Sequence, residues 1–121
     1  MNCNCAIENK NVIHFIKGTT VNLTFSFDED ISSYTYANFG IARNYGSTPV
    51  IDENIDIEEA NTINIELTPT QTGEFNEFLN GKSSEQYLWW LDLIDTENDI
   101  RVNVFPQTGE AAPLCIVYKH V

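Results

Sequence analysis

The stretch Val21–Phe27 reads VNLTFSF, and its apolar side chains occupy every second position. The polar residues Asn22, Thr24 and Ser26 separate them. A period of two places the apolar side chains on one face of an extended strand and the polar ones on the other. Three acidic residues follow directly, as expected at a turn. This stretch therefore predicts a β-strand with one buried face.

The same alternation recurs through the rest of the chain. It predicts further strands at residues 12–16, 34–41, 51–57, 62–67, 87–94, 100–105 and 113–118. Acidic residues stand between the isoleucines of 51–57, a pattern typical of an edge strand. Seven to eight short strands with evenly spaced turns favour an all-β fold, an antiparallel immunoglobulin-like β-sandwich. Residues 1–121 are expected to form a single domain, from which residues 1–11 can extend as an N-terminal arm.

One short helix is expected after the strand at 62–67. Thr68 suits the N-cap position and Pro69 the first helical position. Phe75, Phe78 and Leu79 follow at the spacing of a single apolar stripe, and Asn80-Gly81 can end the helix. The pattern predicts at most three turns of helix, covering one end of the sandwich.

The charge balance restricts the partners of the protein. Eighteen acidic residues against six basic ones give a formal net charge of −12. Such a chain repels nucleic acid and anionic membrane surfaces, so neither is expected as a partner. The N-terminal residues carry neither a basic region nor an apolar run, so no signal peptide is predicted. We expect synthesis in a host cytoplasm, from which the protein can still leave as part of a particle.

The three cysteines, Cys3, Cys5 and Cys115, do not suggest a disulfide framework, because their number is odd. Thiols that stay free are the first expectation. A bridge from Cys115 to Cys5 or Cys3 requires the first and last strands to be neighbours. A metal site would need His14 or His120 as a fourth ligand, and the cysteine spacing is unusual for zinc.

No arrangement of catalytic residues is recognisable in the sequence. Nucleophilic catalysis needs a base beside a Ser, Cys or Thr, and no Gly-x-Ser-x-Gly element is present. The acidic turn at residues 95–99 lacks the Gly and Glu that complete a calcium loop. Asp92 is expected either to face solvent or to pair with Arg101 across a hairpin. No catalytic, cofactor-binding or metal-binding residue is assigned, and the protein is not expected to be an enzyme.

Aromatic side chains are the main candidates for a binding surface. Alternation predicts that Tyr34 and Tyr36 share an outward face, and Tyr45 falls in a loop rich in turn residues. Because exposed Tyr is enriched at protein interfaces, Tyr34, Tyr36 and Tyr45 are predicted to contact other proteins. Trp89 and Trp90 are assigned to the core. The alternative is that these five aromatics form a platform for a sugar.

The order of these segments resembles a phage protein family. The turn Phe15–Thr20 (FIKGTT) opens an alternating strand, and a second strand ends in FGIAR at Phe39–Arg43. The elements LTPTQT at Leu67–Thr72 and YLWWLDL at Tyr87–Leu93 follow. In this order they resemble the N-terminal domain of upper baseplate (BppU-like) proteins of tailed phages. The likeness covers Phe15–Val121, with Thr19 in place of the usual Asp and a longer final turn at residues 106–112.

The resemblance implies a non-enzymatic virion protein that acts by assembly. Its partners would be other virion proteins or copies of itself in a homo-oligomer. It would lie in the tail, the baseplate or on the capsid surface. The alternative function is a carbohydrate-binding β-sandwich module that recognises a host-surface glycan.

Overall fold

In the computed structural model, the described residues are 12–75, 82–105 and 114–119. They form an all-β fold with one short helix. The first four strands are β1 (Val12–Ile16), β2 (Val21–Ser26), β3 (Tyr36–Ala42) and β4 (Ile51–Asp56). They are followed by β5 (Thr62–Leu67), α1 (Pro69–Thr72), β6 (Ser84–Asp95), β7 (Ile100–Phe105) and β8 (Leu114–Tyr118).

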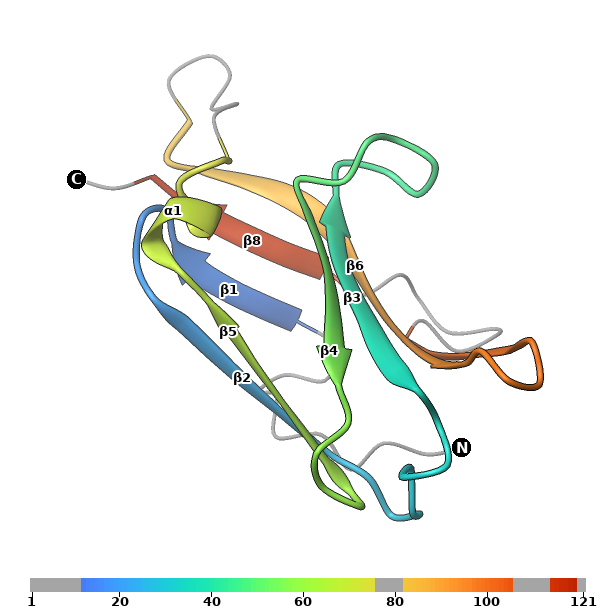
Figure 1. Cartoon of the computed structure of the whole chain (residues 1–121). Coiled ribbons are helices and arrows are strands. Elements are labelled where there is room, and N and C mark those ends of the chain that lie inside the picture. Colours follow the sequence, from blue (N-terminus) through green and yellow to red (C-terminus); the bar gives the residue numbers. More distant parts are fainter. Residues whose placement is uncertain (1–11, 76–81, 106–113, 120–121) are drawn as a thin grey trace.

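The strands form a large and a small sheet (Figure 1). The large sheet has the order β1-β8-β6-β3-β4, and β7 also pairs with β6. β6 is the central strand, because it pairs with β3, β7 and β8. β4 lies at the edge as the acidic pattern predicted. The small sheet is the antiparallel pair β2–β5, in which Val21 lies opposite Leu67.

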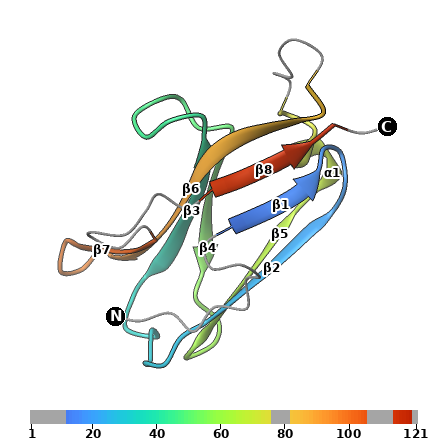
Figure 2. The ribbon, with the colours of Figure 1, turned by 180° about the vertical axis from the view of Figure 1, so that it is seen from behind.

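The pairing of β1 with β8 differs from the expected antiparallel arrangement, since these two strands are parallel (Figure 2). Antiparallel order is forced where a short hairpin joins two strands, whereas parallel strands need a long connection. β1 and β8 are the first and last strands along the chain, and all the other described elements come between them in sequence. No hairpin therefore constrains their direction, and the large sheet is mixed.

The two sheets share one hydrophobic core. Phe25 of β2 is fully buried, and its ring centroid lies 5.7 Å from that of Trp89 and 6.4 Å from that of Phe39. Trp89 belongs to β6 and Phe39 to β3, so these aromatic contacts join the small sheet to the inner face of the large one. The alternation seen in the sequence thus selects which side chains enter the core.

Helix α1 is shorter than predicted, with four residues, Pro69–Thr72. Its start agrees with the sequence: the Thr68 hydroxyl accepts a hydrogen bond from the Gln71 N–H, and the Gln71 Oε1 accepts one from the Thr68 N–H. The helix ends at its C-cap residue Gly73, and glycine has a low helix propensity. Phe78 and Leu79 lie outside the described residues. No helix in the described ranges is long and apolar enough to cross a membrane.

Candidate functional site

The outer face of the large sheet carries a polar network around Trp90. On β3 and β6, Phe39 and Trp89 point into the core, so their neighbours Asn38 and Trp90 belong to the opposite face. Trp90 lies opposite Gly40 of β3, and its six-membered ring covers that glycine so closely that a Cβ there would overlap the ring. The indole Nε1–H donates to Asn38 Oδ1 at 2.8 Å. The ring is therefore held in place over Gly40.

Asn38 connects three strands through this network. Its Nδ2 group donates to Asp52 Oδ1 at 2.8 Å and to Asn54 Oδ1 at 2.9 Å, both on β4. Its Oδ1 also accepts a hydrogen bond from Arg101 Nη2 of β7 at 3.1 Å. All side-chain polar atoms that are buried within the described ranges have a hydrogen-bond partner. A fully satisfied network of this kind holds its members in one geometry.

Asp92 provides the second centre of the network. It is 6% exposed, its Oδ2 accepts a hydrogen bond from Arg101 Nε at 2.7 Å, and the same oxygen forms an ion pair with Arg101 Nη2 at 2.6 Å. Its Oδ1 accepts from Asn103 Nδ2 at 2.6 Å. Of the two alternatives expected for Asp92, the pairing with Arg101 is confirmed, whereas a solvent-facing position is wrong. Because Asp92 is buried, removing the positive partner would leave an uncompensated charge.

Tyr45 completes this region from the loop between β3 and β4. Its side chain is 45% exposed, and its hydroxyl donates to the Trp89 carbonyl oxygen at 3.2 Å. Partial burial, with the nearby negative charge of Asp92, raises the pKa of the Tyr45 phenol. Tyr45, Trp90 and the polar side chains of Asp92, Arg101 and Asn103 line a hollow of about 340 Å³. We call it the Tyr45–Trp90 hollow.

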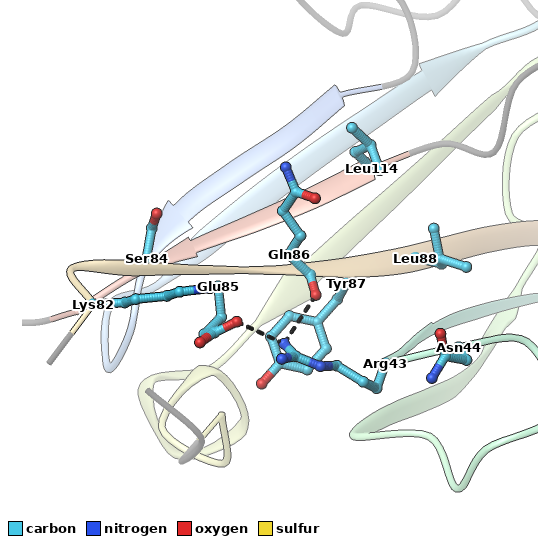
Figure 3. A pocket seen from close by; sticks show the side chains of 9 residues that line it. All are labelled: Arg43, Asn44, Lys82, Ser84, Glu85, Gln86, Tyr87, Leu88 and Leu114. Carbon is cyan, nitrogen blue, oxygen red and sulfur yellow. Dashed lines mark hydrogen bonds and ion pairs between the residues drawn. The ribbon is translucent and has the colours of Figure 1, made fainter. Parts of the chain in front are cut away.

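A second hollow lies where β3 ends beside the first half of β6 (Figure 3). Arg43 reaches over the Tyr87 ring, with its guanidinium carbon 5.2 Å from the ring centroid. It donates to the Gln86 carbonyl oxygen at 3.1 Å and forms an ion pair with Glu85 at 2.9 Å. Glu85 is buried, so the pair holds the β3–β4 loop against β6. These contacts give Arg43 a structural role, which is to fix the loop after β3 to β6.

A third surface gathers lysines beside exposed apolar side chains, and we call it the lysine end. Ile16 and Tyr118 lie opposite each other on β1 and β8 and are 48% and 42% exposed. The Lys17 N–H donates to the Tyr118 carbonyl, and the Lys119 N–H donates to the Ser83 carbonyl. Lys17, Lys119 and the neighbouring Lys82 therefore lie at the same end of the large sheet.

The opposite end of the molecule carries acidic residues, and we call it the acidic end. β2 runs from the lysine end to the acidic end. Beyond β2, the Phe27 N–H donates to the Asn61 carbonyl and the Ile31 N–H donates to the Ala60 carbonyl. These bonds bring the segments 28–30 and 58–59 together. Both segments are exposed. The acidic end consists of Asp28, Glu29, Asp30, Glu58 and Glu59.

The predicted interface tyrosines do not form one surface. Tyr34 packs against the core and Tyr36 is half-buried, whereas Tyr45 is exposed. The expectation that Tyr34 and Tyr36 share an outward face is wrong, because Tyr34 lies in a turn, with its N–H bonded to the Ile31 carbonyl, and β3 begins only at Tyr36. Alternation does not extend through a turn.

The two tryptophans also separate. Trp89 is in the core as predicted, but Trp90 lies on the outer face. The sequence places apolar residues on both faces of this strand, which favoured burial on both sides. Trp90 is accommodated by Gly40, which lies opposite it on the neighbouring strand. Gly40 stands 50 positions earlier in the chain, so this pairing can be seen only from the strand register.

Cys115 is a free, fully buried thiol, and burial raises its pKa. Its strand does lie beside the first strand, as a bridge to Cys5 or Cys3 would require. Cys3, Cys5 and His120 lie outside the described residues, as does the suggested arm at 1–11. Within the described ranges, no three metal-ligating side chains gather.

No protein-family model matches the chain, and no curated protein matches it in sequence.

Proposed function

We propose that the protein is a non-enzymatic structural component of a phage virion that acts by protein–protein assembly. Its two sheets around one core support an immunoglobulin-like sandwich as the finer class of the fold. The order of turns and strands that resembles the upper baseplate family gives the virion setting, in the tail, the baseplate or on the capsid. The protein would be made in the host cytoplasm and leave it within the particle.

The exposed Ile16–Tyr118 pair at the lysine end carries the proposal. Both side chains are more than two-fifths exposed, although they lie on paired strands at the edge of a sheet. Covering them with a partner would remove apolar surface from water, the dominant favourable contribution to association. Tyr is among the side chains most enriched at interfaces.

The charges at the two ends indicate a second copy as the partner. Three lysines lie beside the apolar pair, and five acidic residues lie at the acidic end. Opposite potentials on two different surfaces of one chain favour head-to-tail contact between copies. Such heterologous contacts form a ring when the rotation closes and a filament when it does not. Both forms occur as repeated elements of a particle.

Light scattering across a concentration series tests this proposal. The unmodified chain should form a defined oligomer, and the double variant Ile16→Thr/Tyr118→Thr should associate about tenfold more weakly, because it loses the apolar contact. Threonine keeps a high strand propensity, so thermal stability should change little.

Ile100→Thr provides the matched control, because Ile100 is also a strand residue and 46% exposed but lies on β7. Its association should equal that of the unmodified chain. A monomeric unmodified chain at every concentration would contradict self-assembly, as would equal losses in the double variant and the control.

A further inference from the structure

We propose that the Tyr45–Trp90 hollow binds a neutral saccharide unit, independently of the assembly proposed above. Two aromatic rings line it: Trp90, lying on the sheet, and Tyr45, from the β3–β4 loop. One face of the Trp90 ring covers Gly40, and the half-buried ring still contributes surface to the hollow. A sugar ring presents C–H groups that pack on the negative face of an aromatic ring.

The polar side of the hollow offers a donor and an acceptor next to each other. The Arg101 side chain is 57% exposed and uses Nε and Nη2 in the network. Asn103 uses its Nδ2 group on Asp92 and on the Phe105 carbonyl. Within the described ranges, Arg101 Nη1 and Asn103 Oδ1 have no hydrogen-bond partner. A donor beside an acceptor matches neighbouring hydroxyl groups, each of which can donate and accept.

The charges favour a neutral ligand over an anionic one. The Asp92 carboxylate neutralises the Arg101 guanidinium, and Asp52 adds a further negative charge beyond Asn38. The negative charge of Asp92 already disfavours an anion at this position, since it contributes to the raised pKa of Tyr45. With a formal net charge of −12 on the whole chain, an approaching phosphate or carboxylate is repelled.

The hollow is fixed before a ligand arrives. Trp90 is held by Asn38, Asn38 by two residues of β4, and Arg101 by Asp92. A site that needs little ordering loses less binding free energy to conformational entropy. Its volume of about 340 Å³ falls near the lower end of the range for small-molecule pockets, roughly 300–1,000 Å³. One sugar unit of a longer glycan suits such a site better than an extended chain.

Titration of the full chain with a panel of neutral sugars tests the proposal. The panel contains glucose, galactose, N-acetylglucosamine and rhamnose at millimolar concentrations, with glucuronic acid as the anionic comparison. Binding is followed by saturation-transfer NMR and by tryptophan fluorescence. We expect at least one neutral sugar to bind, and glucuronic acid to bind more weakly than glucose.

Tyr45→Ala should weaken binding by about tenfold, because one of the two rings is lost. Tyr45→Phe keeps the ring and should bind nearly as well as the unmodified chain. Tyr45 is 45% exposed, so its removal should leave the fold intact, as thermal unfolding can check. The Ile16→Thr/Tyr118→Thr variant should bind sugar normally, which separates this site from the assembly surface.

Three results would overturn the proposal. They are no binding of any neutral sugar, binding that Tyr45→Ala leaves unchanged, and tighter binding of glucuronic acid than of glucose. None of them bears on the assembly measurement, which uses different residues and a different readout.

Discussion

At the scale of single residues, Gly40 determines what the outer face of the sheet can present. Any side chain at this position would collide with the Trp90 ring, which lies opposite it on β6. Glycine in a strand interior normally lowers stability, because it loses more backbone freedom on folding and offers no side chain to pack. Here the indole ring fills the missing contact, and the Asn38 hydrogen bond keeps it there.

Gly40→Ala should lower the free energy of unfolding by about 1–3 kcal/mol, because the new methyl group displaces the Trp90 ring. In the Trp90→Ala background the same change should instead raise stability, by about 0.5–1 kcal/mol, since alanine is then free of the overlap. Urea unfolding of the four proteins gives this double-mutant cycle. Equal effects of Gly40→Ala in both backgrounds would show that Trp90 does not depend on the glycine.

At the scale of elements, most strands could be predicted from alternation because their inner faces are apolar and their outer faces polar. The start of β6 could not, since Ser84–Gln86 looks like a polar loop. Glu85 of this segment is buried and forms an ion pair with Arg43. The two residues are far apart in the chain, so the local sequence does not show this contact. The start of α1 could be predicted from its local capping residues, whereas its length could not.

The candidate site was less predictable than the strands. The aromatic character of the surface was visible in the sequence, and Tyr45 was among the predicted residues. Trp90 was assigned to the core and entered only the alternative sugar platform, and Asn103 was missed, because these residues come together through the register of β3, β6 and β7. A one-residue shift in register would send these side chains to the other face. Local sequence patterns do not contain that information.

The turn between β6 and β7 holds one residue in an unusual conformation. Asp99 has a φ of 53°, in the left-handed region that β-branched residues avoid. Asp99→Val should therefore lower stability by about 1–2 kcal/mol, whereas Asp99→Asn should leave it nearly unchanged. Glu97→Val in the same turn is the matched control, because Glu97 does not have a positive φ. Thermal unfolding would refute this account if both valine variants behaved alike.

At the scale of the whole molecule, association between copies depends more on how charge is separated between the two ends than on the net charge. A formal net charge of −12 predicts repulsion between copies. Arg43 and Arg101 are engaged in ion pairs with Glu85 and Asp92, whereas the three described lysines gather at one end of the large sheet. Attraction between unlike ends can then act at short range while the molecules as a whole repel each other.

This arrangement predicts that association between copies depends on salt and on the sign of charge at each end. Raising ionic strength from 0.1 to 1 M shortens the screening length from about 10 to about 3 Å, which should weaken the oligomer. Lys82→Glu/Lys119→Glu should make the chain monomeric, because two acidic ends then meet. Glu29→Lys/Glu58→Lys/Glu59→Lys should do the same, because the acidic end then carries more lysines than carboxylates and repels the lysine end.

An equimolar mixture of these two variants distinguishes head-to-tail contact from any other. In the mixture, the lysine end that now carries acidic residues faces the acidic end that now carries lysines. The unchanged acidic end of the first variant likewise faces the unchanged lysine end of the second. Light scattering should therefore show that the mixture regains the oligomer that neither variant forms alone. A mixture that stays monomeric would exclude the lysine end and the acidic end as partners, and the contact would have to involve surfaces other than these two ends.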